Sequence, residues 1–320
     1  MKRLKAIGGA YYHLVNRCAL QHFLFTDDDK SAFVAMLRRV AAFSGIDILT
    51  HCVMSNHYHV LVRVPPPRPL SETELLARVG ILYGTDRAKD MRLRWADYRK
   101  KGLKDLLADE QNRLLGRMND ISPFMKSLNQ RFSVWYRAHH AGHKGTLWES
   151  RFGSTLVEGN GSLAAVAAYI DLNPVRAGIV SDPKAYAYSG YGAAMAGDTA
   201  ALESLRGIYG DSARSPAQTL QAYRGLLYSK GAETSDMDAS DEASKKPALP
   251  QLLRKKIRAM THGMAIGSKT FTTGIFAQHR DLFSKNRRHP PKGIALCPDW
   301  DGIQLCSVRH HRPPASASPA

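Results

Sequence analysis

The first third of the chain changes between two hydrophobic periodicities. Residues 10–17 (AYYHLVNR) are rich in aromatic and β-branched side chains and predict a strand. Residues 26–45 place apolar side chains at helical spacing between polar N-terminal capping residues and a final glycine, which predicts a helix. Residues 46–54 and 57–64 predict two antiparallel strands joined by a tight Ser-Asn turn. The predicted order is therefore strand, helix, hairpin.

The middle of the chain changes to a mostly helical pattern. Prolines end the sheet pattern, and residues 71–140 are charged and helical, with an amphipathic stretch at its end. Residues 142–159 indicate a loop and a short strand. Residues 160–178 predict a helix with a narrow apolar stripe, which Pro174 stops.

These patterns predict how the chain is organised. Residues 1–200 are expected to form one domain, with a basic helical insertion at about 66–140. A helical extension (201–230), a flexible linker (231–248) and a basic accessory region with a disordered tail (249–320) are expected to follow. The expected fold class is α+β: a mostly antiparallel ferredoxin/RRM-like palm sheet with packed helices, plus a helical accessory C-terminal region.

Composition and charge narrow the choice of partner. The net charge is +17, from 45 Lys and Arg against 28 Asp and Glu, which favours a polyanionic partner such as nucleic acid over a merely solvated basic surface. The four cysteines have neither zinc-finger spacing nor the density of a disulfide framework. The pattern contains no signal peptide and no apolar run long enough to span a membrane, so a cytoplasmic, nucleoid-associated protein is expected.

Two histidines on one predicted strand are the first candidate site. His57 and His59 are two residues apart, so their side chains point to the same face of the sheet and can share one divalent ion. The alternative is a pair of half-exposed histidines on an open sheet face. Tyr58, Val60, Val62 and Val64 occupy the opposite face and are expected to pack in a core.

Tyr169 and Asn173 are the second candidate site. They lie four residues apart, on the flank of the apolar stripe of the predicted helix. Tyr169 is either an aromatic residue at the edge of the core or, above a metal-bearing strand, a nucleophile. The amide oxygen of Asn173 is a candidate third ligand. Pro174 disfavours helical geometry at Asn173, which is expected at a frayed helix end.

The sequence GTLWESRF (145–152) is the third candidate site. Arg151 suits bidentate contact with a phosphate, and Trp148 suits stacking on a base. The alternative is a buried tryptophan beside a structural ion pair of Glu149.

Five sequence blocks in this order resemble those of the single-tyrosine HUH transposases, and in particular the REP-associated tyrosine transposases and related transposase-like proteins. The resemblance covers about residues 3–195. A sixth block after residue 205, HGMAIGSKTF, is similar to a segment of some members. The five blocks are YYHLVNR (11–17), MSNHYHVLV (54–62), GTLWESRF (145–152), YIDLNPVRAGIV (169–180) and YAYSGY (186–191).

The resemblance implies a role for each matching residue. His57 and His59 match the metal ligands, Tyr169 matches the nucleophile, and Asn173 matches the position of the third ligand, where many relatives have Gln. Tyr136, on a helix near a basic run, is the rival nucleophile. The implied cofactor is Mg²⁺ or Mn²⁺.

The implied activity is nicking and strand transfer of single-stranded or hairpin DNA through a 5′-phosphotyrosine intermediate, with repetitive extragenic hairpins as the target. No external energy source is needed, and the chain has no P-loop sequence. No membrane partner is expected, and a monomer is favoured over a dimer. The residues expected to contact DNA are Arg151, Trp148, Arg17, Arg176, Lys100 and Lys101.

Two other functions stay open. In one, the domain is a catalytically inactive regulator that binds hairpin DNA or RNA, and Tyr169 is structural. In the other, it is a metal-dependent nuclease that uses water as the nucleophile. The joint presence of Tyr169 and both histidines favours the strand transferase.

Overall fold

The structure is a computed structural model of the 320-residue chain. The residues it describes are 4, 9–19, 24–159, 161–209, 215–228, 260, 263–282, 292–294 and 305–308. None of the helices in these ranges is both long and apolar enough to cross a membrane.

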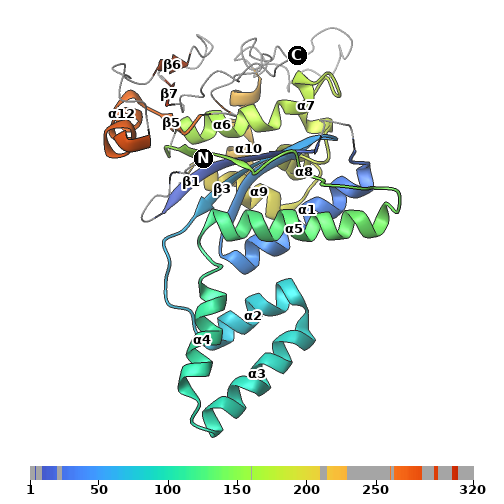
Figure 1. Cartoon of the computed structure of the whole chain (residues 1–320). Coiled ribbons are helices and arrows are strands. Elements are labelled where there is room, and N and C mark those ends of the chain that lie inside the picture. Colours follow the sequence, from blue (N-terminus) through green and yellow to red (C-terminus); the bar gives the residue numbers. More distant parts are fainter. Residues whose placement is uncertain are drawn as a thin grey trace, which may run out of the picture.

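The described elements follow the predicted order and then extend it (Figure 1). The strands are β1 (Ala10–Arg17), β2 (Asp47–Val53), β3 (His57–Val64), β4 (Gly153–Val157), β5 (Ala265–Gly267), β6 (Lys292–Ile294) and β7 (Leu305–Val308). The helices are α1 (Asp27–Ser44), α2 (Glu72–Tyr83), α3 (Thr85–Lys100), α4 (Lys104–Leu115), α5 (Ile121–His139), α6 (Gly161–Asp171), α7 (Asn173–Arg176), α8 (Gly190–Met195), α9 (Thr199–Arg206), α10 (Pro216–Leu227) and α12 (Lys269–Gln278).

The ends of α1 are set by the signals that predicted them. Thr26 caps the helix: its hydroxyl accepts from the Asp29 backbone N–H, and the Asp29 carboxylate accepts from the Thr26 backbone N–H. Gly45 ends the helix in the left-handed region, at φ 63°, where a residue without a Cβ is favoured. The helix therefore begins and ends where the sequence predicts.

One seven-stranded sheet forms the centre of the molecule. Its strand order is β2-β3-β1-β4-β5-β7-β6, and neighbouring strands are antiparallel except for β4 and β5, which are parallel. With helices packed on it, this sheet confirms the predicted α+β class with a mostly antiparallel palm. The block 186–191 lies along the outer edge of β2, where the Val53 backbone N–H donates to the Tyr188 carbonyl.

Helices cover both faces of the sheet, which makes three layers. Helices α1 and α5 lie on one face and α6 lies on the other (Figure 1). Helices α2, α3 and α4 project beyond the α1/α5 layer, away from α6. The basic insertion thus extends the side of the molecule opposite to α6.

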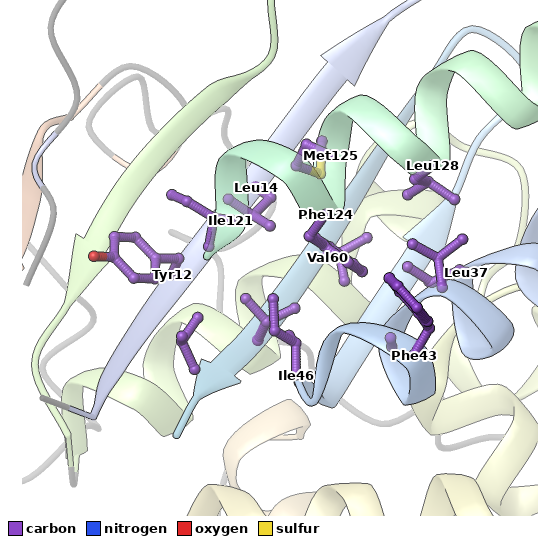
Figure 2. Packing of buried hydrophobic residues seen from close by; sticks show 14 of the residues in the cluster. Tyr12, Leu14, Leu37, Phe43, Ile46, Val60, Ile121, Phe124, Met125 and Leu128 are labelled. Carbon is purple, nitrogen blue, oxygen red and sulfur yellow. The ribbon is translucent and has the colours of Figure 1, made fainter. Parts of the chain in front are cut away.

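The α1/α5 face holds the larger hydrophobic core. Every second residue of β1 and β3 points into it, including Leu14 and Val60, and α5 lays Phe124 and Leu128 over these strands (Figure 2). Tyr58, Val60 and Val62 are fully buried there, as the alternation predicts. The other face of β3 carries His57 and His59 together with the fully buried Leu61, which belongs to a second hydrophobic cluster on the α6 side.

The C-terminal region joins the sheet by strands that the sequence pattern did not predict. β5 pairs with β4, and β7 and β6 extend the sheet beyond it. These strands have three or four residues each, so they carry little periodicity of their own. The predicted linker at 231–248 lies outside the described residues, and so do residues 254–258 (RKKIR), which are the most basic part of the predicted accessory region.

Candidate metal and tyrosine site

His57 and His59 lie at the start of β3 and face α6. The turn before them is closed by a hydrogen bond from the Met54 backbone N–H to the His57 carbonyl. His59 is buried and lies opposite Val15 of β1, whereas His57 is half-buried and lies opposite Arg17. Their ring centroids are 5.1 Å apart. The structure thus places both rings on one face, as the spacing predicts.

Each of these imidazoles is held through its Nδ1 atom. His57 Nδ1 lies 2.6 Å from the side-chain oxygen of Asn56, an acceptor in the turn. His59 Nδ1 lies 2.8 Å from Nε2 of His13 on β1. His13 Nδ1 in turn lies 2.7 Å from the backbone carbonyl oxygen of Met260. In both cases Nε2 is the nitrogen directed away from these partners.

The electrostatics of the site favour neutral histidines. Burial lowers the pKa of His13 to about 4 and lowers that of His59 well below its usual value. The positive charges of Arg176 and Arg17 lower the pKa of His59 further. Neutral imidazole is the form that binds a metal ion. The same two guanidinium groups make the site attractive to an anion such as a phosphate.

Tyr169 lies on α6, above the histidine strand. Its ring centroid is 6.3 Å from that of His59 and 6.4 Å from that of His13. The side chain is 2% exposed, and the guanidinium of Arg176 lies over its ring at 3.9 Å. Arg176 also donates to the Tyr169 carbonyl oxygen at 2.6 Å. The tyrosine and the histidines of one chain therefore meet across the interface of helix and sheet.

Asn173 lies beside His57. Its side-chain nitrogen is 3.2 Å from His57 Nε2. The expectation of a frayed helix end at this position is wrong, because α6 ends at Asp171 and Asn173 begins the short helix α7, with Pro174 in its first turn. Proline is favoured in a first helical turn, where its missing N–H is not needed. This break turns the chain so that Asn173 reaches His57.

A buried carboxyl group anchors the end of α6. Asp171 accepts hydrogen bonds from the Thr50 hydroxyl of β2, the Tyr191 backbone N–H and the Tyr223 hydroxyl of α10. Burial raises its pKa to about 7, against the effect of these donors. Asp171 thus ties the helix that carries Tyr169 to strand β2 at one end.

The predicted DNA-contacting residues fall into two groups. Arg17 and Arg176 lie at the site, as described above. Trp148 packs into the α1/α5 core, with its ring 5.5 Å from Tyr58 and 6.0 Å from Phe25, and its indole N–H donates to the Asn129 carbonyl. The base-stacking role of Trp148 stays a prediction, and so does a role for the exposed Arg151.

Lys100 and Lys101 are distant from the histidine face. They lie at the end of α3, in the projection on the other side of the sheet (Figure 1). Lys101 forms an ion pair with Asp97 at 2.8 Å. The insertion therefore neutralises part of its own positive charge.

The rival nucleophile Tyr136 is on the other side of the molecule. It is 4% exposed on α5, and its hydroxyl donates to the Leu24 carbonyl oxygen at 3.2 Å. Its ring stacks on His140 at 4.0 Å. The structure does not bring Tyr136 to His57 and His59.

The donors at the site fit a divalent cation with nitrogen and oxygen ligands. Nε2 of His57 and Nε2 of His59 supply imidazole nitrogens, and the Asn173 amide supplies an oxygen if it turns by 180°. The separation of 3.2 Å between that amide and His57 Nε2 suits two neighbouring ligands, since bonds of about 2.1 Å at a right angle set ligands about 3 Å apart. Across the described residues, no group of three or more His, Cys, Asp or Glu is arranged to hold a metal. Among the described residues, the side chain that would complete such a site is therefore the Asn173 amide.

Sequence reasoning missed His13, Asn56 and Met260. His13 and Asn56 were inside the quoted blocks, and His13 shares its face of β1 with Arg17 by simple alternation. What the sequence does not contain is the register that sets His13 diagonal to His59, or the path that brings Met260 to β1.

Comparison with protein families supports the relation predicted from the sequence blocks for the first part of the chain. Residues 6–73, which carry β1, α1, β2 and β3, match the profile of the family described as Transposase IS200 like. A solved structure entitled "Structure of the REP associates tyrosine transposase bound to a REP hairpin" is similar with 14% identity and a TM-score of 0.40, over 62% of this chain and 86% of that chain. No curated protein matches the chain.

The family match confirms the predicted resemblance for the segment that contains His57 and His59. It indicates a relation to proteins that act on DNA in transposition. Tyr169 and Asn173 lie outside the matched segment, so their roles rest on the geometry given above.

Proposed function

We propose that the protein cuts and rejoins single-stranded DNA through a covalent bond to Tyr169, most effectively at hairpin-forming sequences. The observation that carries the proposal is the contact of Tyr169 with His59 in one chain, with ring centroids 6.3 Å apart, next to the contact of Asn173 with His57. A nucleophile and metal-binding side chains that lie against each other suit attack on a phosphodiester that enters between α6 and β3.

The chemistry follows from these residues. The phenol oxygen of Tyr169 forms a bond to phosphorus as the bond from phosphorus to the 3′ oxygen breaks. The phenol proton is lost and the 3′ oxygen gains one, which leaves a 5′-phosphotyrosine and a free 3′-OH. A second 3′-OH reverses the step and rejoins the strand, so no external energy source is consumed.

The chain's own residues prepare this step. His57, His59 and Asn173 would hold a divalent cation, which supplies Lewis-acid polarisation of the phosphate when bound. Imidazole ligands favour Mn²⁺ over Mg²⁺, which prefers an all-oxygen shell. Arg17 and Arg176 orient the anionic backbone beside Tyr169. The proximity of Tyr169 to the histidines of the same chain supports a monomer as the active unit.

A second candidate is a non-catalytic protein that binds hairpin DNA or RNA. The observation that favours it is the burial of Tyr169, which is only 2% exposed and is covered by Arg176. Under the first proposal, binding of DNA must draw Arg176 onto a phosphate and uncover the phenol.

One assay separates these functions. Labelled hairpin oligonucleotides with single-stranded flanks are incubated with the protein and Mn²⁺, and protein–DNA adducts that survive SDS are measured. We expect an adduct that Tyr169→Phe lowers by at least about a thousand-fold, since loss of a nucleophile is among the largest effects of a single substitution. Tyr136→Phe is the matched control, because Tyr136 is equally buried on the other face, and it should retain the adduct.

The other outcomes are equally informative. An adduct that persists in Tyr169→Phe would refute the nucleophile. Tight binding without an adduct would favour the non-catalytic function, and cleavage without an adduct would favour a nuclease that uses water.

A further inference from the structure

His13 is a fully buried histidine on β1 to which neither the resemblance nor the proposed chemistry assigns a role. It lies opposite Leu61, and its neighbour Val15 lies opposite His59, so His13 and His59 are diagonal neighbours on one face of the sheet. Their rings are nearly parallel, with centroids 5.0 Å apart and an interplanar angle of 27°. This arrangement joins the two rings by one hydrogen bond of 2.8 Å between His13 Nε2 and His59 Nδ1.

The directions of the hydrogen bonds that link His59, His13 and Met260 follow from the Met260 carbonyl group. The Met260 carbonyl oxygen can only accept, so His13 Nδ1, 2.7 Å away, carries the proton. In a neutral ring, Nε2 of His13 then has a free electron pair and must accept. His59 Nδ1 is therefore the donor, and the electron pair of His59 lies on Nε2.

We infer that His13 is a positioning residue for the proposed metal site: with the Met260 carbonyl behind it, it fixes the tautomer of His59 that can ligate a cation through Nε2. The inference that His59 ligates a metal rests on the proposed function. The inference about the tautomer of His59 does not. Histidine ligands need such a partner on the other ring nitrogen, and loss of the partner weakens metal binding.

The tautomer of His57 is fixed by a neighbouring residue instead. Its Nδ1 faces the side-chain oxygen of Asn56, one residue earlier in the turn. His59 instead depends on a residue 46 positions away, which depends on a carbonyl 247 positions further along the chain.

The C-terminal region is thereby given a role in the site. Besides Met260, the Gly263 carbonyl accepts from the Thr155 hydroxyl of β4 at 2.7 Å, and β5 pairs with β4 directly afterwards. Met260 and residues 263–267 are thus fastened to the sheet, Met260 through His13 and the others through β4. Met260 holds the carbonyl that orients the two buried histidines.

The test uses the full-length protein labelled with ¹⁵N in histidine, without metal. Long-range ¹H–¹⁵N spectra distinguish imidazoles protonated at Nδ1 from those protonated at Nε2. We expect His13 and His59 to be Nδ1–H tautomers in the wild type. A His59 ring protonated at Nε2 in the wild type would overturn the inference without any variant.

Two variants then test the consequence. His13→Leu removes the acceptor at similar volume, and we expect Mn²⁺ affinity, measured by calorimetry, to fall about 10- to 100-fold. His13→Gln keeps an acceptor oxygen and should recover most of that affinity. His51→Leu is the matched control: His51 is also buried, on β2, and it pairs with Val60 rather than with the site.

The results separate the two proposals. A folded His13→Leu protein with wild-type Mn²⁺ affinity and an unchanged His59 tautomer would overturn the role of His13. A wild-type protein that does not bind Mn²⁺ would instead overturn the metal-dependent function, whatever the tautomers are. If His13→Leu fails to fold, the wild-type spectrum and His13→Gln decide.

Discussion

The two faces of strand β3 differ in the side chains at its start, where His57 and His59 stand on one face only, although Leu61 on that face is fully buried in a second hydrophobic cluster. Tyr58, Val60 and Val62 point to the α1/α5 side and are fully buried among hydrocarbon and aromatic side chains. His57 and His59 alternate with them and point to α6. There the Nδ1 atom of each ring has a polar partner, on Asn56 for His57 and on His13 for His59. Burial on the first face stabilises the fold through the hydrophobic effect, which does not depend on the orientation of the groups in contact. Burial on the second face requires directed hydrogen bonds, because an unpaired polar group there costs free energy.

The comparison teaches how one strand separates stability from chemistry. Because successive side chains point to opposite sides, the same backbone is held rigid by one face and presents ligands on the other. The polar face is not a loose surface, since His59 and Tyr169 are as buried as core residues. Substitutions on each face should therefore affect different measurements.

The largest expected effect is on stability, from Phe33 on α1. Its ring is fully buried, 4.5 Å from that of Tyr58 and 5.0 Å from that of Phe132. Phe33→Ala should lower the free energy of unfolding by about 3–5 kcal/mol, measured by urea denaturation. The Mn²⁺ affinity of the folded protein should not change. Val134→Ala, exposed on α5, is the control and should stay within about 0.5 kcal/mol. A parallel loss of Mn²⁺ affinity in Phe33→Ala would contradict the separation of the two faces.

The next effect concerns a buried histidine on the hydrocarbon side. Burial, together with the charge of Arg38 and against that of Asp198, lowers the pKa of His51 to about 4. Between pH 6.5 and 4 the unfolded chain therefore binds a proton that the folded chain does not, so stability is lost as the pH falls through this window.

Replacement of His51 isolates this contribution. His51→Leu cannot take up the proton, so the stability of the wild type relative to the variant should fall by at most about 1.4 kcal/mol per pH unit as the pH falls from 6.5 to 4. Urea unfolding of both proteins at several pH values measures the difference. Parallel curves would show that His51 titrates alike in the folded and unfolded chain.

The smallest expected effect concerns DNA affinity. Arg17 lies beside His57, whereas Lys101 lies in the α2–α4 projection and is paired with Asp97. Arg17→Gln should reduce the salt dependence of single-stranded DNA binding by about 0.7 in the slope of log K against log salt, which corresponds to one lost phosphate contact. Lys101→Gln should leave the slope unchanged. An equal change in both would place the DNA on both sides of the sheet.

Local signals explain what the sequence predicted. The helix α1, the hairpin of β2 and β3 and the common face of His57 and His59 each depend on caps, turns and alternation within a few residues. Tyr169 was placed near the histidines because an apolar stripe on its helix had to pack on a sheet.

What the sequence did not predict depends on pairing between distant segments. Strands β5, β6 and β7 are too short to show a periodicity and exist because a neighbouring strand completes their hydrogen bonds. Asn173 was expected at a frayed helix end. The sequence indicates that Pro174 disfavours helical geometry in the residue before it, but it does not indicate that a second short helix, α7, begins there. His13 is part of a block that the sequence analysis quotes, but its role cannot be predicted without the register of β1 on β3 and the position of Met260.

The hydrogen bond between His13 and Met260 also has a consequence for the order of assembly. Strand β1 leaves the ribosome before β3, and the two strands can pair soon after β3 has been made. The carbonyl that fixes His13 does not exist until residue 260 has been synthesised, and closing so long a loop comes late in folding. A nascent chain thus has its histidine strand long before the ring orientation is set, and maturation of the site waits until about two hundred further residues have been made.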